Sequence, residues 1–272
     1  MQIYEAINFD KIIESGGSTY PWLVVVIDSD MKPCKYVVKL FTERQMNQQN
    51  PIAKEIFGNI LARELGLSVP EFALVNFGDS FCQTLESENI NILNNKHRGL
   101  KFGCEYIDSA AIVNINNQKV FWKSYDIGSI FAFDNLIGNI DRGGARNKPN
   151  LLIKNEDFIL IDHEQIFTFA DDENFYNDTI ITDFRKGIWR YNAQQHLFFS
   201  ILRSLKNEEK ENIFDTFHEH LNYLDVNSLN SSVQFLSKNN LSVGNYSLIK
   251  DYLTEIKTNS GKFINLLKQS IL

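Results

Sequence analysis

The sequence has few cysteines and no long apolar run. Its three cysteines, Cys34, Cys82 and Cys104, share no spacing typical of a metal site, and an odd number cannot all pair with one another. They indicate reduced thiols in a cytoplasmic protein. The longest strongly apolar run, Trp22 to Ile27, is far too short to cross a bilayer, so we expect no membrane association.

Positive charge is also in short supply. The chain has 27 Lys and Arg against 34 Asp and Glu, a formal net charge of −7 at pH 7. Nucleic-acid binding that depends on counterion release needs many basic side chains, so we expect no direct binding of nucleic acid. The first residues lack a basic stretch followed by an apolar core, and we therefore expect no secretory signal. Internal repeats, coiled-coil heptads and low-complexity tails are absent as well.

The composition is that of an ordinary globular protein. Hydrophobic residues make up 43% and charged residues 22% of 272 residues, enough chain to bury a sizeable core as one large domain or as two lobes. Apolar stretches predict strands at Trp22 to Ile27, Lys35 to Phe41 and Leu100 to Ile107. The segment from Tyr4 to Glu14 is either a first strand or an irregular lead-in. Helical spacing of apolar residues predicts a helix from Ile52 to Leu65.

The second half of the chain is expected to be mostly helical. Its histidines, His196, His218 and His220, have no Cys or carboxylate at metal-ligand spacing, so we expect structural or surface roles for all three. Amphipathic patterns predict helices over 193–205, 208–221, 226–236 and 246–272.

The stretch from Phe133 to Phe167 contains the candidate catalytic and metal-binding residues. It combines the end of an apolar helix, a polar loop rich in Gly, Asn and Arg, and two short apolar strands joined by a tight turn, which predicts a hairpin. The hairpin brings Asn150, at its first strand, close to Asp162, after its second strand, and Asp141 enters from the loop. Each residue alone is typical of a turn. Together their oxygens suit Mg²⁺ on nucleotide phosphates, as in a phosphoryl-transfer site.

Three motifs in this stretch resemble the catalytic core of HipA-like kinases, a bacterial branch of the protein-kinase-like and phosphoinositide-kinase-like superfamily. Asn139-Ile140-Asp141-Arg142 resembles the catalytic N-x-D-R motif, which implies that Asp141 is the catalytic residue. Lys148-Pro149-Asn150 resembles the K-P-x-N run of kinases, and Leu160-Ile161-Asp162-His163 resembles the segment with their metal-binding Asp. By this resemblance Asn150 and Asp162 bind the metal. The loop before Asn150 is longer than usual, so Asn147 is a rival for the Asn role.

The resemblance extends to the first part of the chain. The run from Leu65 to Val75 is similar to the L-G-L-P-V-P-x-x-A-L-V turn from helix to strand in this family. Lys39 is similar to the strand lysine that holds the α- and β-phosphates, and Glu55 to the helix glutamate that pairs with it, with Glu64 as a rival. An edge-strand lysine and a residue that favours the helix dipole would otherwise explain Lys39 and Glu55. The other implied nucleotide-binding residues are Gly16, Gly17, Ser18 and Thr19 in a loop over the phosphates, and Glu105, Tyr106 and Ile107 at the adenine edge.

The implied fold is α+β and two-lobed. A small antiparallel sheet with one helix would span residues 1–107, a larger helical lobe would span 108–272, and ATP and Mg²⁺ would bind between them. The implied activity is transfer of the γ-phosphate to a serine or threonine hydroxyl of a protein. HipA-like kinases often act as toxins, which implies a small antitoxin partner. Two alternatives stay open: a small-molecule or lipid kinase or AMP-transferase on the same fold, and a pseudokinase that acts as a binding module.

Overall fold

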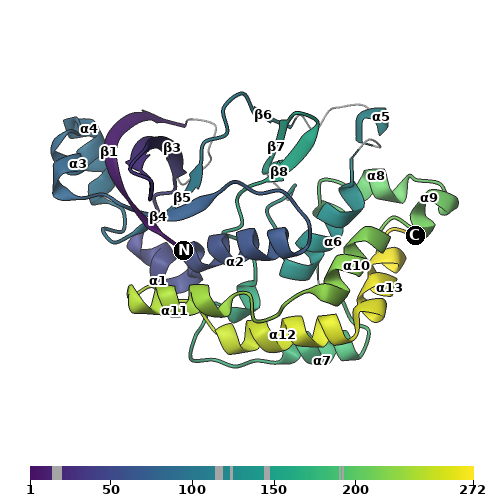
Figure 1. The fold of residues 1–272 in the computed structure, drawn as a ribbon. Helices are drawn as coiled ribbons and strands as arrows, with labels where there is room; N and C mark the ends of the chain where they lie inside the picture. Colours follow the sequence, from purple (N-terminus) through teal and green to yellow (C-terminus); the bar gives the residue numbers. More distant parts are fainter. Residues whose placement is uncertain (14–19, 114–118, 123–124, 144–147, 190, 192) are drawn as a thin grey trace.

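Five strands close into a barrel near the start of the chain (Figure 1). The computed structural model describes residues 1–13, 20–113, 119–122, 125–143, 148–189, 191 and 193–272. The order around the barrel is β1-β2-β3-β5-β4, and the stretch that could have been an irregular lead-in is the longest of these strands. The strands are β1 Ile3–Ile12, β2 Trp22–Ile27, β3 Pro33–Val38, β4 Phe72–Asn76 and β5 Lys101–Glu105.

The barrel corrects the expectation of a small antiparallel sheet. Strand β1 pairs with β2 in the antiparallel direction and with β4 in the parallel direction, with Ile3 opposite Leu74. Two register shifts bend β1, the first between Ala6 and Asn8. A long strand bent in this way reaches both edges of the sheet and closes it, which the apolar pattern of the sequence does not reveal.

The described part of residues 1–107 contains four helices, where one was expected. The predicted helix is preceded by a separate one, which begins with a capping box between Thr42 and Gln45. Asn50, with a left-handed backbone (φ 47°), ends that helix, and Pro51 opens the next at its first position. The four helices are α1 Glu43–Gln49, α2 Pro51–Glu64, α3 Asp79–Gln83 and α4 Ser87–Asn94.

The predicted hairpin is present in the middle of the chain. Strand β7 (Leu151–Lys154) pairs in the antiparallel direction with β8 (Asp157–Leu160), and β6 (Ala111–Ile112) adds a third strand. Asn155 and Glu156 join β7 to β8 with φ values of 50° and 67°. Positive φ at both central residues is typical of the type I′ turn, which matches the twist of two short strands.

The rest of the described chain is mostly helical, as expected, with shorter helices than the sequence pattern predicts. Asn259, for example, separates two helices in the range where one long helix was expected. Within the described residues, no helix is both long and apolar enough to span a bilayer. The helices are α5 Lys119–Trp122, α6 Ile127–Ile137, α7 Thr179–Arg185, α8 Phe199–Arg203, α9 Asn207–Glu211, α10 Asp215–Tyr223, α11 Asn230–Lys238, α12 Tyr246–Thr258 and α13 Ser260–Ser270.

Helix α2 lies between the barrel and the C-terminal helices (Figure 1). It contacts β5 on one side and α11 on the other, and most of its side chains are buried. Gly58, in the middle of the helix, has no room for a side chain, because a Cβ there would overlap Cβ and Cγ of His163. This close approach holds α2, and with it Glu55, against the segment that follows β8.

A buried carboxylate at Asp134, in α6, anchors the loop that follows this helix. Its oxygens accept hydrogen bonds from Nδ2 of Asn139 (2.9 Å), Nε of Arg142 (2.5 Å) and Nε2 of His196 (2.9 Å). Because Nδ1 of His196 accepts the backbone N–H of Phe198 (3.1 Å), the ring is neutral with its proton on Nε2. Every member of this network is fully or almost fully buried, so the loop between them has little freedom.

The contact at Gly58 predicts a strong effect of one methyl group. We expect Gly58→Ala to lower the free energy of unfolding by about 1–3 kcal/mol, because the packed segment around His163 must move away. Gly261→Ala is the matched control: it adds the same methyl group to a helix with no atom within 4 Å, and it should be neutral or stabilising by up to about 1 kcal/mol. Urea denaturation of both variants measures this, and equal midpoints would contradict the packing argument.

The buried histidine predicts a pH dependence. Burial lowers the pKa of His196, although Asp134 opposes this, so below about pH 6.5 the unfolded chain binds a proton that the folded chain does not. Stability is therefore lost as the pH falls through this range, by at most about 1.4 kcal/mol per pH unit. His196→Gln should give a shallower slope of unfolding free energy between pH 7 and 5. Equal slopes in the wild type and in His196→Gln would refute the assignment.

Candidate functional site

The ammonium group of Lys39 is the centre of the candidate site. Lys39 follows β3 directly, one residue beyond the strand, and its backbone N–H donates to the carbonyl of Phe102 in β5 (3.0 Å). Its Nζ contacts Oε1 of Glu55, Oδ1 of Asp162 (2.5 Å) and Oε2 of Glu164 (3.3 Å). Glu55 comes from α2 and the other two from the segment after β8, so one side chain connects the barrel, the helix and the hairpin.

The pKa values in this cluster depend on the balance between burial, which disfavours every charge, and the neighbouring opposite charges, which favour it. Burial works against the charge on Lys39, but Asp162, Glu55 and Glu164 outweigh it and hold its pKa well above the ordinary range. For Asp162, burial is likewise outweighed, chiefly by Lys39, and the pKa is lowered. Burial raises the pKa of Glu55, and Lys39 does not compensate fully. The charged pair in this cluster is therefore Lys39 with Asp162, whereas Glu55 has an increased affinity for a proton.

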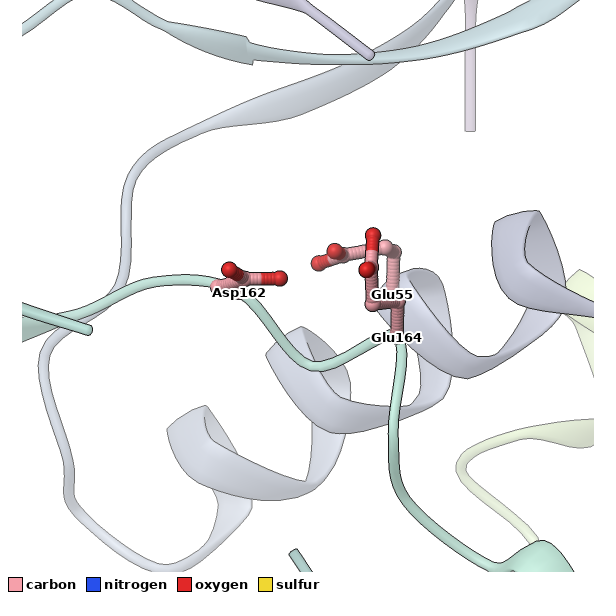
Figure 2. Close-up of side chains that lie close together, drawn as sticks. All are labelled: Glu55, Asp162 and Glu164. Atoms are coloured by element: carbon pink, nitrogen blue, oxygen red, sulfur yellow. The ribbon is translucent and has the colours of Figure 1, made fainter. Parts of the chain in front are cut away.

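The carboxylates of Glu55, Asp162 and Glu164 form a candidate cation site. Each offers an oxygen within 4.8 Å of the others, and no second such group of Asp, Glu, His or Cys occurs among the described residues. Figure 2 shows the three carboxylates turned toward one another. Asp162 has a left-handed backbone (φ 67°), which Asp adopts more readily than most residues. Hard oxygen donors next to a single ammonium group fit a divalent cation such as Mg²⁺.

Asp141 and Asn150 lie together at the same open end of the hairpin as Asp162. Nδ2 of Asn150 donates to Oδ2 of Asp141 (3.2 Å) and to its carbonyl (3.3 Å), so the Oδ1 atom of Asn150 is the one left to face a metal. Nζ of Lys148 lies 3.3 Å from the Asp141 carboxylate. The carbonyl of Asn150 accepts the N–H of Ile161 (3.2 Å), which keeps the residue before Asp162 beside Asn150.

The remaining predicted site residues differ in their burial and in their hydrogen-bond partners. The rival Glu64 is exposed, whereas Glu55 is buried against Lys39. The N–H of Glu105 donates to Glu71 (2.7 Å) and that of Tyr106 to Lys35 (2.8 Å), so neither donor is available to an adenine ring. Ile107 is partly buried after the end of β5. The loop residues Gly16, Gly17, Ser18 and Thr19, and the rival metal ligand Asn147, lie outside the described residues.

Sequence reasoning did not assign two features of the site. Glu164 is a third carboxylate at Lys39, and its position two residues after Asp162 was the only signal available. The network around Asp134 depends on a contact with His196, 62 positions along the chain, which no local pattern reveals. The predicted structural role of His196 is confirmed by this contact, since it contacts a carboxylate inside the core.

A pocket of about 490 Å³ opens beside Asp141. It is bordered by α1 on one side and by the loop with Asp141 and Lys148 on the other, and Glu164 also reaches it. The site therefore has an entrance next to the carboxylate that was predicted to face the acceptor.

Comparison with solved structures supports the fold. The kinase CtkA, a proinflammatory kinase of Helicobacter pylori, is similar with a TM-score of 0.52 and 15% sequence identity, over 98% of this chain and 97% of that chain. HipA of Shewanella oneidensis, solved in a complex with HipB and its operator DNA, gives a TM-score of 0.32 and 12% identity, over 96% of this chain and 65% of that chain. The second likeness is too weak to support an argument, and the first supports a shared fold alone.

The family follows from the sequence comparison. No curated protein matches the chain. The sequence model of the HipA-like kinases matches residues 11–238, which is most of the chain and includes Lys39, Asp141 and Asp162. This agrees with the resemblance of the motifs and with a buried cluster of acidic residues around a lysine. The protein belongs to the family of HipA-like kinases.

Proposed function

We propose that this kinase transfers the γ-phosphate of ATP to a serine or threonine hydroxyl of a protein. Membership of the family makes it a kinase and implies the use of ATP and a divalent metal. The observation that carries the residue roles is the contact of Lys39 with Glu55 and Asp162, because it joins three residues that kinases use together.

The binding step depends on Lys39. Its ammonium group is held in place by Glu55 and can bind the α- and β-phosphate oxygens of ATP. Asp162 and the Oδ1 atom of Asn150 would hold the metal, and Glu164 would add a further carboxylate beside Asp162. Mg²⁺, when bound, would supply positive charge that stabilises the phosphates during transfer. The predicted loop of Gly16 to Thr19 would cover the phosphates.

The transfer step depends on Asp141. Its carboxylate orients the acceptor hydroxyl and takes up its proton, while the hydroxyl oxygen forms a bond to the γ-phosphorus. The bond from this phosphorus to the bridging oxygen breaks, and ADP leaves with the electron pair. Lys148, beside Asp141, stabilises the negative charge of the transferred group. Orientation and electrostatic stabilisation supply most of the rate in such a reaction.

The first prediction from this scheme concerns nucleotide binding. ATP with Mg²⁺ at about a hundred times its dissociation constant should stabilise the wild type by about 2.7 kcal/mol. Asp162→Asn should lose this shift, because it removes the charge that pairs with Lys39 and the metal. Asp157→Asn changes an exposed aspartate at the start of β8, the strand that precedes Asp162; it is the control and should keep the shift. Thermal unfolding with and without Mg²⁺ measures the shift. A normal shift in Asp162→Asn would remove that residue from the site.

The second prediction separates binding from transfer. In Asp141→Asn the amide oxygen can still accept from Asn150, so the shift with ATP and Mg²⁺ should remain. Phosphate transfer should fall by about 10²–10⁴-fold, because the amide cannot take up the proton. Intact-mass analysis of the wild type and of an added protein acceptor follows the product. A normal rate in the variant would contradict the role of Asp141.

The same mass analysis separates the alternatives. Addition of AMP instead of phosphate would favour an AMP-transferase, and modification of a small molecule alone would favour a small-molecule or lipid kinase. A wild type without any metal-dependent shift would favour a pseudokinase that acts as a binding module. The division into lobes at residue 107 and the existence of a small antitoxin partner stay predictions.

A further inference from the structure

Helix α1 forms one wall of the pocket beside Asp141. Arg44, Gln45, Gln48 and Gln49 line it from this helix, and Asp141 faces it from the loop. Among the described lining residues, Ile140 is the only apolar one, so the pocket suits a polar or charged group. This helix was not expected from the sequence, and no step of the proposed transfer uses it.

The wall formed by α1 offers hydrogen-bond donors. Oε1 of Gln45 already accepts from the N–H and hydroxyl of Thr42 (2.9 and 3.0 Å), which leaves its NH₂ group. Oε1 of Gln48 accepts from Nε of Arg44 (3.0 Å), which leaves the NH₂ group of Gln48 and the two terminal nitrogens of Arg44. Because Gln45 and Gln48 have their oxygens engaged and their NH₂ groups left, and Arg44 adds two terminal nitrogens, these three side chains favour a ligand with negatively charged or carbonyl oxygens.

The charges around the pocket lead to the same conclusion. The carboxylate of Asp141 has Lys148 beside it (3.3 Å), and that of Glu164 has Lys39 (3.3 Å). Arg44 has no carboxylate at ion-pair distance in the part of the chain that the structure describes. It is therefore the cation of this pocket that is left for a ligand, in a protein with a net charge of −7.

We infer that Arg44, with the amides of Gln45 and Gln48, binds a carboxylate of the acceptor polypeptide next to the phosphorylated hydroxyl, so that this kinase selects acidic sites. Arginine is suited to this role because its fork of N–H groups binds both oxygens of a carboxylate. The inference rests on the proposed protein kinase activity and names its substrate class.

The location of the pocket assigns this anion to the acceptor and not to ATP. Of the described residues proposed to hold ATP or the metal, Glu164 reaches the pocket, whereas Lys39, Asn150 and Asp162 do not line it, and neither do the three predicted adenine-edge residues. Asp141, the group proposed to take the proton of the acceptor hydroxyl, does line it. A group that lies against α1 therefore approaches from the side of the acceptor.

The test uses the full chain and a positional library of serine and threonine peptides, in which each flanking position is fixed in turn as Asp, Glu, Lys or Ala. The wild type should prefer Asp or Glu over Lys at one or more flanking positions by about ten- to hundredfold in kcat/KM. Arg44→Gln should lose this preference, and Arg44→Glu should reverse it in favour of Lys. Arg203→Gln, at an exposed arginine on α8 outside the pocket, is the matched control and should keep it.

The other outcomes overturn the inference in distinguishable ways. An acidic preference that is the same in Arg44→Glu, or a wild type that prefers basic or neutral flanks, would refute the role of Arg44 and leave the kinase activity intact. A higher KM for ATP in Arg44→Gln, with an unchanged peptide preference, would place Arg44 at the nucleotide instead. A wild type that binds ATP and Mg²⁺ but phosphorylates no peptide in the library and no added protein would refute the proposed protein kinase function itself.

Discussion

The site depends on one buried ammonium group with three carboxylates around it. A buried charge is costly unless it is paired, and removal of one partner leaves the others uncompensated. Lys39 contacts Glu55 from α2 and both Asp162 and Glu164 from the segment after β8. Its own backbone is fixed to β5 by the carbonyl of Phe102. The barrel, the helix and the hairpin must therefore keep their relative positions. If any one of them moved, a buried carboxylate would lose its contact with Lys39 and would be left unpaired.

The buried network around Asp134 holds the loop with Asp141 in place. Asn150 links this network to the ion pairs of Lys39. The side chain of Asn150 donates to Asp141, while its carbonyl accepts from Arg142 of the buried network and from the N–H before Asp162. The backbone of Asn150 is left-handed (φ 43°), a conformation that Asn adopts more readily than most residues. An alanine there would lose the hydrogen bond to Asp141 and would strain the turn. One asparagine thus relates the group proposed to take the proton to the group proposed to hold the metal.

The local elements and motifs could be predicted from the sequence, whereas contacts between segments far apart in the chain, including those that close the barrel, could not. The hairpin follows from two apolar runs and a turn, and α2 from its periodicity, so both were predicted, and the predicted ends of α2 differ from the observed ones by one residue each. The barrel was not predicted, because the parallel pairing of β1 with β4 joins segments far apart in the chain. Glu164 and the contact of Asp134 with His196 were missed for the same reason, since only the folded chain brings each to its partner. The Asn50-Pro51 pair is a local signal of a helix boundary. It indicates where α2 begins, but it does not reveal that another helix, α1, ends there.

The groups proposed to select the acceptor lie on α1, whereas the groups proposed to perform the chemistry lie outside this helix. Helix α1 is joined to α2 at Asn50 and also packs against it, but the side chains of α1 that line the pocket make no contact with Lys39 or Asp162 among the described residues. A substitution on α1 can therefore change the donors that face an acceptor without disturbing the buried ion pairs. The reverse does not hold, because Glu55 lies on α2 and any shift of that helix would alter Lys39 as well. We infer that selectivity can vary on α1, whereas α2 is constrained by both packing and charge.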